Sequence, residues 1–481
     1  MKNLGSLVAR ALGRRPRRPP VGLAAQLAVQ DPLTARTASP QADQPIASSA
    51  DDRLGRGAFA RRAAQVVAEV QGMEDSSVLG LAGPWGSGKS SLINLICEEI
   101  GEPWQVCRAN MWAPPDVAGL LAELFATIRS ALPDGGAAGR ARALFAEYAK
   151  LAVPALSVVP VVGDAAEGIA ANIVDYRADR PMSQVFEQLS AQLRRLGLRV
   201  LVVLDDVDRL QPDELLMLFK AIRLLARFPG VYYLLAYDEQ TVIDVLVGTP
   251  IAEGSPERAL AYLEKIVQVR LDLPPAQRYY TEQMLSDGIT ELLGRLGMTM
   301  TDEQTFRFRE LYDNLLQFTL AQPRAVGRFL RQAFAYLPMT DPGEFDLVDF
   351  LALTHLRSLA PGSYQVLARS KEPLTRAPGN ADEPAAAALR ELLRTRVSAE
   401  CGDAAERVME VVTELFPAIG AEGGAGFTTA DWRQRAASMR ASADEYFDRY
   451  FLFGLAAGDI ADSTACGALT AIARGAPRAA R

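Results

Sequence analysis

The chain has 481 residues, of which 49% are hydrophobic and 23% charged, and its formal net charge is −7. These values are ordinary for a soluble globular protein, and the length suggests about three domains. The single histidine, His355, lies in an apolar helical pattern, so a Ser-His-Asp triad is not expected. The absence of close cysteine pairs argues against a zinc site or a disulfide scaffold and favours a reducing cytosol, the cysteines being Cys97, Cys107, Cys401 and Cys466.

The first 50 residues differ in composition from the rest of the chain. They contain seven Lys or Arg and two Asp, a net charge of +5, which leaves −12 for residues 51–481. Because this stretch is rich in Arg, Pro, Ala and Ser, we expect a disordered basic arm over 1–50. The acidic body is a poor binder of nucleic acid, whereas the arm could contact nucleic acid or anionic lipid. The apolar stretch after the arginines is broken by Gln26 and Gln30, which argues against a secretory signal.

Residues 83–90 read GPWGSGKS, a complete G-x-x-x-x-G-K-S phosphate loop. The loop follows an apolar strand pattern at 77–82 and precedes a helical pattern that ends at Gly101. In this context the glycines let backbone N–H groups surround a phosphate, and the helix N-terminus adds partial positive charge. Lys89 should reach the β- and γ-phosphates, and Ser90 should bind Mg²⁺. A Gly-rich turn without a nucleotide is the alternative. The expected nucleotide contacts are Gly83, Pro84, Trp85, Gly86, Ser87, Gly88, Lys89, Ser90 and Ser91.

A second part of the predicted site lies more than a hundred residues downstream. Residues 198–204 read LRVLVVL, the pattern of a strand buried on both faces, and Asp205 and Asp206 follow directly. Open α/β sheets bind ligands at the carboxyl ends of their strands, so this is a Walker B pattern. We expect Asp205 to be the Mg²⁺ partner and Asp206 to polarise the attacking water. The alternative is a strand end followed by solvated acids.

The remaining elements of the core alternate between strand and helix. Strands are predicted at 106–110, at 231–237 before Asp238, and at 267–273, where apolar and polar residues alternate. Helices are predicted over 51–70, 120–132 and from Pro212 to about 225. This order predicts a parallel sheet flanked by helices, an α/β fold spanning 51–275.

A helical insertion is expected at about 133–182, within the core. Its residues 151–163 read LAVPALSVVPVVG, which is thirteen residues without a charge. A helix of that length covers about 20 Å, short of a bilayer core of roughly 30 Å. We therefore expect a packed helical insertion, with an interfacial hairpin at 151–175 as the alternative. The chain is expected in the cytoplasm, with peripheral contact at the inner membrane face left open.

From residue 276 onward the patterns are helical. A lid or sensor subdomain is expected over 276–340, followed by a C-terminal helical region over 341–481. The segment from Gln322 to Leu330 opens a helix that carries Arg324 and Arg328 on one face. Further helices are predicted at 345–359 and 404–416, and a mobile connection at 361–388, which contains Pro, Gly and an alanine run.

Six segments, in order, resemble the KAP family of P-loop NTPases, and the resemblance covers about residues 50–335. The phosphate loop has that family's Trp before the second glycine, and Gln322 stands where the family has Asn. The segments are GPWGSGKS at 83–90, NMW at 110–112, DDVDR at 205–209, AYD at 236–238, YLEKIVQ at 262–268 and QPR at 322–324.

The resemblance implies an ASCE-type P-loop sheet, in which one strand lies between the two Walker strands, with ATP as the nucleotide. It also implies that Asp238 is a polar sensor and that Arg324, with Arg328 as a weaker candidate, reaches the γ-phosphate. Arg209 could instead act across a subunit interface. Bacterial members are often linked to phage exclusion, and many members carry membrane spans between the Walker motifs, where this chain has only the stretch at 151–175.

The sequence is compatible with three functions. The first is an ATPase that couples Mg-ATP hydrolysis to conformational change or assembly, with protein partners or further copies of itself. The second is a slowly hydrolysing, nucleotide-gated switch or scaffold, whose site would look the same. The third is a small-molecule kinase, which would need an acceptor pocket and phosphate-clamping arginines close to the site that the sequence does not indicate.

Overall fold

The computed structural model describes residues 44–70, 77–111, 114, 116–157, 181–340, 343–376, 383–420, 428–455 and 458–473. The described chain divides into two compact units, one ending at Pro275 and the other beginning at Ala276. The expected basic arm lies almost entirely outside these residues, as do Trp112 and most of the stretch at 151–175. No helix in the described part of the chain has the length and hydropathy that crossing a bilayer requires.

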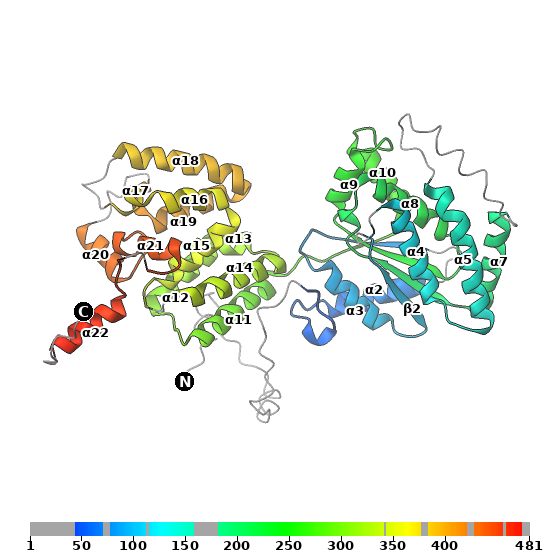
Figure 1. The fold of residues 1–481 in the computed structure, drawn as a ribbon, viewed down its shortest axis with the longest axis horizontal. Helices are drawn as coiled ribbons and strands as arrows, with labels where there is room; N and C mark the ends of the chain where they lie inside the picture. Colours follow the sequence, from blue (N-terminus) through cyan, green and yellow to red (C-terminus); the bar gives the residue numbers. More distant parts are fainter. Residues whose placement is uncertain are drawn as a thin grey trace, which may run out of the picture. The chain divides into compact units, whose positions relative to one another are not determined.

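The unit from Pro45 to Pro275 is built on one five-stranded parallel sheet in the order β2-β3-β4-β1-β5 (Figure 1). The strand after which the Walker B acids follow, β3, is therefore separated from the phosphate-loop strand, β1, by β4. This arrangement confirms the predicted ASCE-type α/β fold. The strands are β1 (Val78–Ala82), β2 (Trp104–Ala109), β3 (Arg199–Leu204), β4 (Val231–Tyr237) and β5 (Val269–Asp272).

Burial explains which apolar runs became central strands. All residues of β1 and β4 are buried, as are five of the six in β3, because helices cover both faces of the sheet. In β5 half-buried and exposed residues alternate, as predicted, since this strand is at an edge and pairs only with β1. Gly80 allows close packing inside the sheet, because a Cβ there would lie 2.7 Å from the Tyr237 hydroxyl.

Helices cover the two faces of the sheet as separate layers (Figure 1). One face packs against α2 and α3 and the other against the remaining helices of this unit. The predicted helix at 51–70 begins later, at Gly57, whose N–H donates to the Asp52 carboxylate. The helices are α2 (Gly57–Val70), α3 (Lys89–Ile100), α4 (Val117–Ala131), α5 (Gly136–Ser157), α7 (Met182–Leu196), α8 (Pro212–Leu225), α9 (Glu239–Val247) and α10 (Pro256–Ile266).

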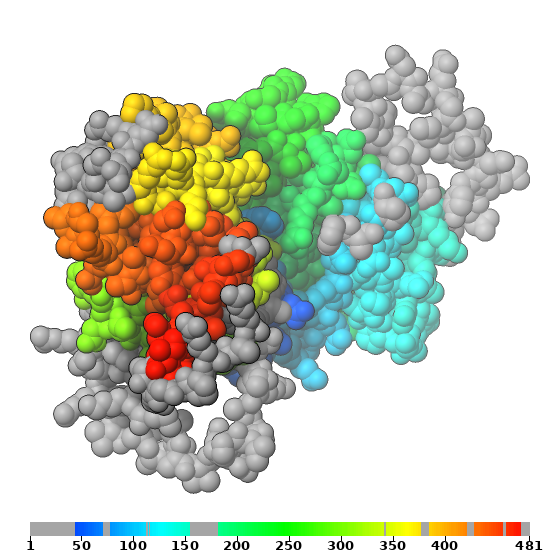
Figure 2. Space-filling model, turned by 60° about the vertical axis from the view of Figure 1, so that its left-hand side comes forward, coloured from blue at the N-terminus to red at the C-terminus, as the bar shows by residue number. Residues whose placement is uncertain are grey.

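The second unit is helical and has one continuous apolar core that runs from α11 to α21. The yellow to red segments form one continuous body in the space-filling view, and the helix nearest the C-terminus, α22, extends from it (Figures 1 and 2). Its α-helices are α11 (Arg278–Leu296), α12 (Asp302–Leu311), α13 (Gln317–Thr319), α14 (Pro323–Tyr336), α15 (Leu347–Leu359), α16 (Pro361–Arg369), α17 (Lys371–Thr375), α18 (Glu383–Cys401), α19 (Ala405–Leu415), α20 (Thr429–Ala437), α21 (Asp444–Leu452) and α22 (Asp462–Ala473).

The prediction of a mobile connection at 361–388 is wrong for its described residues. They form α16, α17 and the start of α18. Pro361 occupies the first turn of α16, where a missing N–H costs nothing. The Glu400 carboxylate then accepts hydrogen bonds from the N–H groups of Gly362 and Ser363, at 2.7 and 3.0 Å. The helix start is thus capped by a residue from α18, which local sequence does not reveal.

A buried ionic network fixes the helical unit. Asp349 is fully buried and accepts hydrogen bonds from the guanidinium groups of Arg307 and Arg440 and from the N–H of Ala441. Arg307 also donates to Asp346 at 2.9 Å. These pairs compensate carboxylates that would otherwise be costly to bury, and they hold α12, α15 and the turn before α21 together.

Candidate nucleotide-binding site

Three chain segments meet at the carboxyl edge of the sheet. Ala82 pairs with Tyr237, and Leu204 pairs with Leu235, so β1, β3 and β4 end close together. The next residues are Gly83 of the loop, Asp205 and Asp238. The parts of the predicted site that lie far apart in sequence are therefore neighbours at the edge where ligands of open α/β sheets bind.

The phosphate loop has the open, glycine-dependent backbone that its sequence predicts. Gly86 and Gly88 have φ angles of 79° and 95°, values that residues with a side chain rarely adopt. A Cβ at Gly88 would also lie 2.9 Å from a guanidinium nitrogen of Arg56. Lys89 is the first residue of α3, so the first N–H groups of that helix are directed at the loop.

Lys89 is held inside the loop rather than extended into solvent. Its Nζ donates to the carbonyl oxygens of Gly83 at 2.9 Å and Pro84 at 3.4 Å. The carboxylate of Asp208 is 3.8 Å away, and both side chains are about 5% exposed. The ammonium group is therefore positioned at the loop by backbone carbonyls and one nearby acid.

Asp208 is a site residue to which sequence reasoning gave no role. Its Oδ2 accepts the N–H of Asp238 at 2.9 Å, which ties the end of β3 to the end of β4. Its Oδ1 is buried and has no hydrogen-bond partner within the described residues. A buried carboxylate oxygen without a donor is costly, so this atom marks a polar position that the protein alone does not satisfy. The third acid of the DDVDR segment at 205–209 was the sequence feature that could have indicated a role for Asp208.

Asp206 has an unusual backbone and an environment suited to accepting a proton. Its φ of 56° lies in the left-handed region, which is uncommon for a residue with a side chain and recurs at functional sites. Its carboxylate pairs with Arg209 at 3.0 Å. Burial raises the pKa of Asp206 above its ordinary value, and Asp205 and Asp208 add to this, while Arg209 opposes it.

The other two predicted acids bond to nearby N–H groups. Asp205 accepts the N–H of Asp206 at 2.9 Å. Asp238 caps α9 and accepts the N–H of Trp85 at 2.9 Å, so it connects the end of β4 to the phosphate loop. This contact places Asp238 beside the loop; its role as a sensor stays a prediction.

Arg56 is a second site residue that the sequence analysis missed. Its guanidinium donates to the carbonyl of Ser87 at 2.6 Å and to that of Pro274 at 3.0 Å. The residue is 6% exposed, and this burial lowers the pKa of its guanidinium. Arg56 therefore links the phosphate loop to the residue pair that follows β5. Because both acceptors are backbone carbonyls far away in sequence, no local pattern signals the contact.

The segment before α2 lies along α3. The N–H of Ile46 donates to Ser91 Oγ at 3.3 Å, and the Asn94 side chain donates to the Ile46 carbonyl at 2.6 Å. Ser49 donates from both its N–H and its hydroxyl to Glu98. The Ser91 side chain thus holds this segment. Ser90 is half-buried at the loop and makes no such contact with the residues that the structure describes.

The predicted arginines of the helical region lie on α14. Arg324 is half-buried near the start of that helix, and Arg328 is exposed one turn later. They belong to the helical unit, so their contact with a γ-phosphate stays a prediction. His355 is buried on α15, where its Nε2 lies 2.8 Å from the Thr319 hydroxyl, and burial lowers its pKa to about 4. It has a structural role in the helical core.

The oxygen donors at this edge fit a magnesium ion. Mg²⁺ prefers hydroxyl, carboxylate and phosphate oxygens, and it binds through one or two carboxylates together with substrate phosphates. The residues present are Ser90 at the start of α3 and the acids that follow β3. The unpartnered buried oxygen of Asp208 adds a negative position at the same place.

The family model of the KAP family P-loop domain matches residues 56–337. The chain belongs to the KAP family. The match begins at Arg56, which fixes the loop, and ends in the helical unit after α14. It confirms the resemblance that the ordered motifs predicted, and with it a P-loop NTPase domain.

A curated relative is the phage T7 exclusion protein of Escherichia coli K12, which is 23% identical over 355 residues. The alignment covers 67% of this chain but only 46% of that protein. Among solved structures, the Walker-type ATPase of Pyrococcus abyssi matches with 14% identity and a TM-score of 0.33, over 77% of this chain and 91% of its own. The ORC2 protein of Aeropyrum pernix matches with 12% identity and a TM-score of 0.34, over 81% and 90%.

Proposed function

We propose that this KAP-family protein binds Mg-ATP at the phosphate loop and hydrolyses it. The observation that carries the proposal is the pairing of a complete loop with Asp206, a carboxylate whose pKa is raised, at the same edge of the sheet. A general base works best when its pKa approaches the operating pH, so this environment suits Asp206 to take a proton from the attacking water.

The remaining roles follow from position. The loop N–H groups and Lys89 would bind the β- and γ-phosphates, with the ammonium exchanging its carbonyl partners for phosphate oxygens. Ser90 and Asp205 would hold Mg²⁺, which neutralises charge on the phosphates. Asp238 would orient the water from the end of β4, and Arg324 would contact the γ-phosphate from the helical unit.

ATP binding and hydrolysis would be coupled to a conformational response of the helical unit. The helical unit would respond to the presence of the γ-phosphate, and hydrolysis would reverse that response, with assembly or partner binding as the output. The name of the E. coli relative suggests phage exclusion as the process. A slowly hydrolysing switch or scaffold is the second candidate, because αL strain at Asp206 and the Arg209 ion pair would also suit a site that holds ATP without rapid turnover.

The substitution Asp206→Asn separates binding from hydrolysis. Asn tolerates the left-handed backbone of this position, so the fold should persist while the proton acceptor is lost. We expect Mg-ATP affinity to be retained and phosphate release to fall by roughly 10² or more. Asp213→Asn, an exposed acid in the first turn of α8, is the control and should keep wild-type turnover.

Turnover that is undiminished in Asp206→Asn would remove the assigned base and move that role to another group. Wild-type phosphate release close to the uncatalysed rate, although Mg-ATP binds, would instead favour the switch. Plaque counts on cells expressing either variant test the phage link: protection that survives Asp206→Asn unchanged would contradict a need for hydrolysis.

A further inference from the structure

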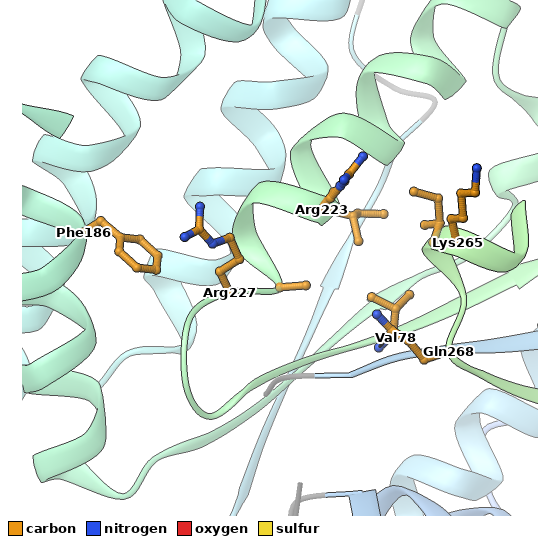
Figure 3. Close-up of a pocket in the computed structure, with 9 residues that line it drawn as sticks. Val78, Phe186, Arg223, Arg227, Lys265 and Gln268 are labelled. Atoms are coloured by element: carbon orange, nitrogen blue, oxygen red, sulfur yellow. Dashed lines mark hydrogen bonds between the residues drawn. The ribbon is translucent and has the colours of Figure 1, made fainter. Parts of the chain in front are cut away.

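A cavity of about 390 Å³ lies at the opposite edge of the sheet from the phosphate loop. It is bounded by the start of β1, the ends of α8 and α10, and α7 (Figure 3). β1 has five residues, so about 16 Å of strand separates this edge from the loop. The lining residues are Val78, Phe186, Ile222, Arg223, Ala226, Arg227, Lys265, Ile266 and Gln268.

Three of the lining side chains are cations, and within the described part of the chain none of the lining residues is acidic. Arg223, Arg227 and Lys265 are exposed, and they form no ion pair with any residue in the part of the chain that the structure describes. Four other exposed arginines of this unit have an ion-pair partner: Arg61, Arg209, Arg258 and Arg270. Three cationic residues line one pocket of a body whose net charge is −12, so this pocket is a local basic site to which an anion would be attracted.

Helix dipoles account for part of this pattern. Arg223 and Lys265 are in the last turns of α8 and α10, where a cation is favourable. Arg227 lies beyond the end of α8, so the dipole does not explain it in the same way. Its guanidinium instead stacks on the Phe186 ring, 5.1 Å from the centroid.

The pocket is also pre-organised. Phe186 is held by the rings of Phe228 and Tyr148, with centroids 4.8 and 6.2 Å away, so the wall on which Arg227 stacks is fixed. Gln268 accepts the N–H of Val78 through its Oε1, and its Nε2 therefore remains as a neutral donor among the cations. A fixed aromatic wall, a guanidinium lying on it and a free amide donor are the features that small-molecule sites combine.

We propose that this pocket binds a small phosphate-bearing molecule with at least two negative charges and about the size of a mononucleotide. Arg223, Arg227 and Lys265 would contact the phosphate oxygens, because charge-assisted hydrogen bonds from guanidinium and ammonium groups to phosphate are strong. The apolar part of the ligand would pack on the outer face of the Arg227 guanidinium, which covers the Phe186 ring. A pocket volume in the range of roughly 300–1,000 Å³ is typical of such sites.

The test uses the full chain with one equivalent of Mg-ADP, enough for the phosphate loop alone, and inorganic pyrophosphate as the titrant in a calorimeter. We expect one further equivalent to bind, with affinity that falls as salt is added. The triple variant Arg223→Gln, Arg227→Gln, Lys265→Gln should weaken this binding by about tenfold or more. The control, Arg194→Gln with Arg195→Gln, removes exposed cations from the end of α7 outside the pocket and should bind as the wild type does.

Equal pyrophosphate affinity in the triple and control variants would overturn the proposal, as would the absence of a second equivalent in the wild type. Flotation with vesicles of phosphatidylcholine and phosphatidylglycerol distinguishes a lipid source of the phosphate: vesicle binding that needs the three cations, without pyrophosphate binding, would also overturn it. ATP affinity at the phosphate loop should be unchanged in the triple variant, which shows that the variant is folded.

Discussion

At the scale of single residues, short sequence motifs predict the residues proposed to contact the nucleotide. They do not predict the residues that hold those motifs in position. The types and spacing of Lys89, Ser90, Asp205 and Asp206 are those that binding of phosphate and Mg²⁺ would require, so these residues could be proposed from the sequence. Arg56 and Asp208 were not assigned roles, because each acts on backbone groups distant in sequence. A motif thus reports the groups that face the ligand more readily than those that hold the motif in place.

Arg209 provides a pH test of the assigned base. The pKa of Asp206 is raised by burial, and the protonated form cannot accept a proton, so hydrolysis should fall as the pH falls through this raised pKa. Arg209 opposes the rise. Arg209→Gln should therefore move the acid limb of the pH–turnover profile to higher pH, with little change on its plateau.

The control for this profile is Arg258→Gln, which removes an ion-paired arginine elsewhere in the same unit. Its acid limb should coincide with that of the wild type. A uniform loss of turnover at every pH in Arg209→Gln would instead fit an arginine that contacts the γ-phosphate, and an acid limb that moves to lower pH would contradict the sign derived for Asp206.

At the scale of elements, the prediction succeeded where hydrophobic pattern decides the structure. The central strands β3 and β4 are continuous apolar runs, because both of their faces are buried. In the edge strand β5 apolar and polar residues alternate, because it is only partly buried. It failed at 361–388, where prolines, glycine and alanines suggested a connection. The alanine run is the start of α18, consistent with the high helix propensity of alanine, and Glu400 supplies the cap of α16 across the fold.

Helix α14 carries Arg324, which we propose contacts the γ-phosphate. Arg324→Ala should reduce ATP hydrolysis far more than ATP binding, on the order of 10³ if this arginine stabilises the transferred phosphate. It should also abolish any difference in protease sensitivity between the ATP and ADP states at 276–340. The control Arg309→Ala removes an exposed arginine paired with Asp313 in the same unit.

The comparison is informative because ADP lacks the group that Arg324 would contact. Equal protection by ATP and ADP in the wild-type protein would leave no basis for a sensor on α14. Wild-type hydrolysis in Arg324→Ala would assign the contact to another arginine, for which Arg328 and Arg209 are the candidates.

At the scale of the whole molecule, the family resemblance predicted that one strand lies between the two Walker strands, as β4 does, whereas nothing in the sequence predicted the internal organisation of the helical unit. Its core is one apolar cluster fixed by buried pairs such as Asp349 with Arg440, whose members are about ninety residues apart. Such contacts have no local signature. The KAP-family match covers the sheet and the first helices of this unit, so the later helices are the part of the protein whose contribution to function is open to experiment.

The central claim, that this chain is an ATPase acting through its phosphate loop, is tested most directly by Mg-ATP binding and phosphate release in Lys89→Ala. Loss of a charge-assisted contact should weaken binding by about 1.5–3 kcal/mol, roughly tenfold or more, and abolish turnover. Lys150→Ala, on the exposed side of α5, should behave as the wild type. A folded Lys89→Ala protein with unchanged ATP affinity and turnover would contradict the account.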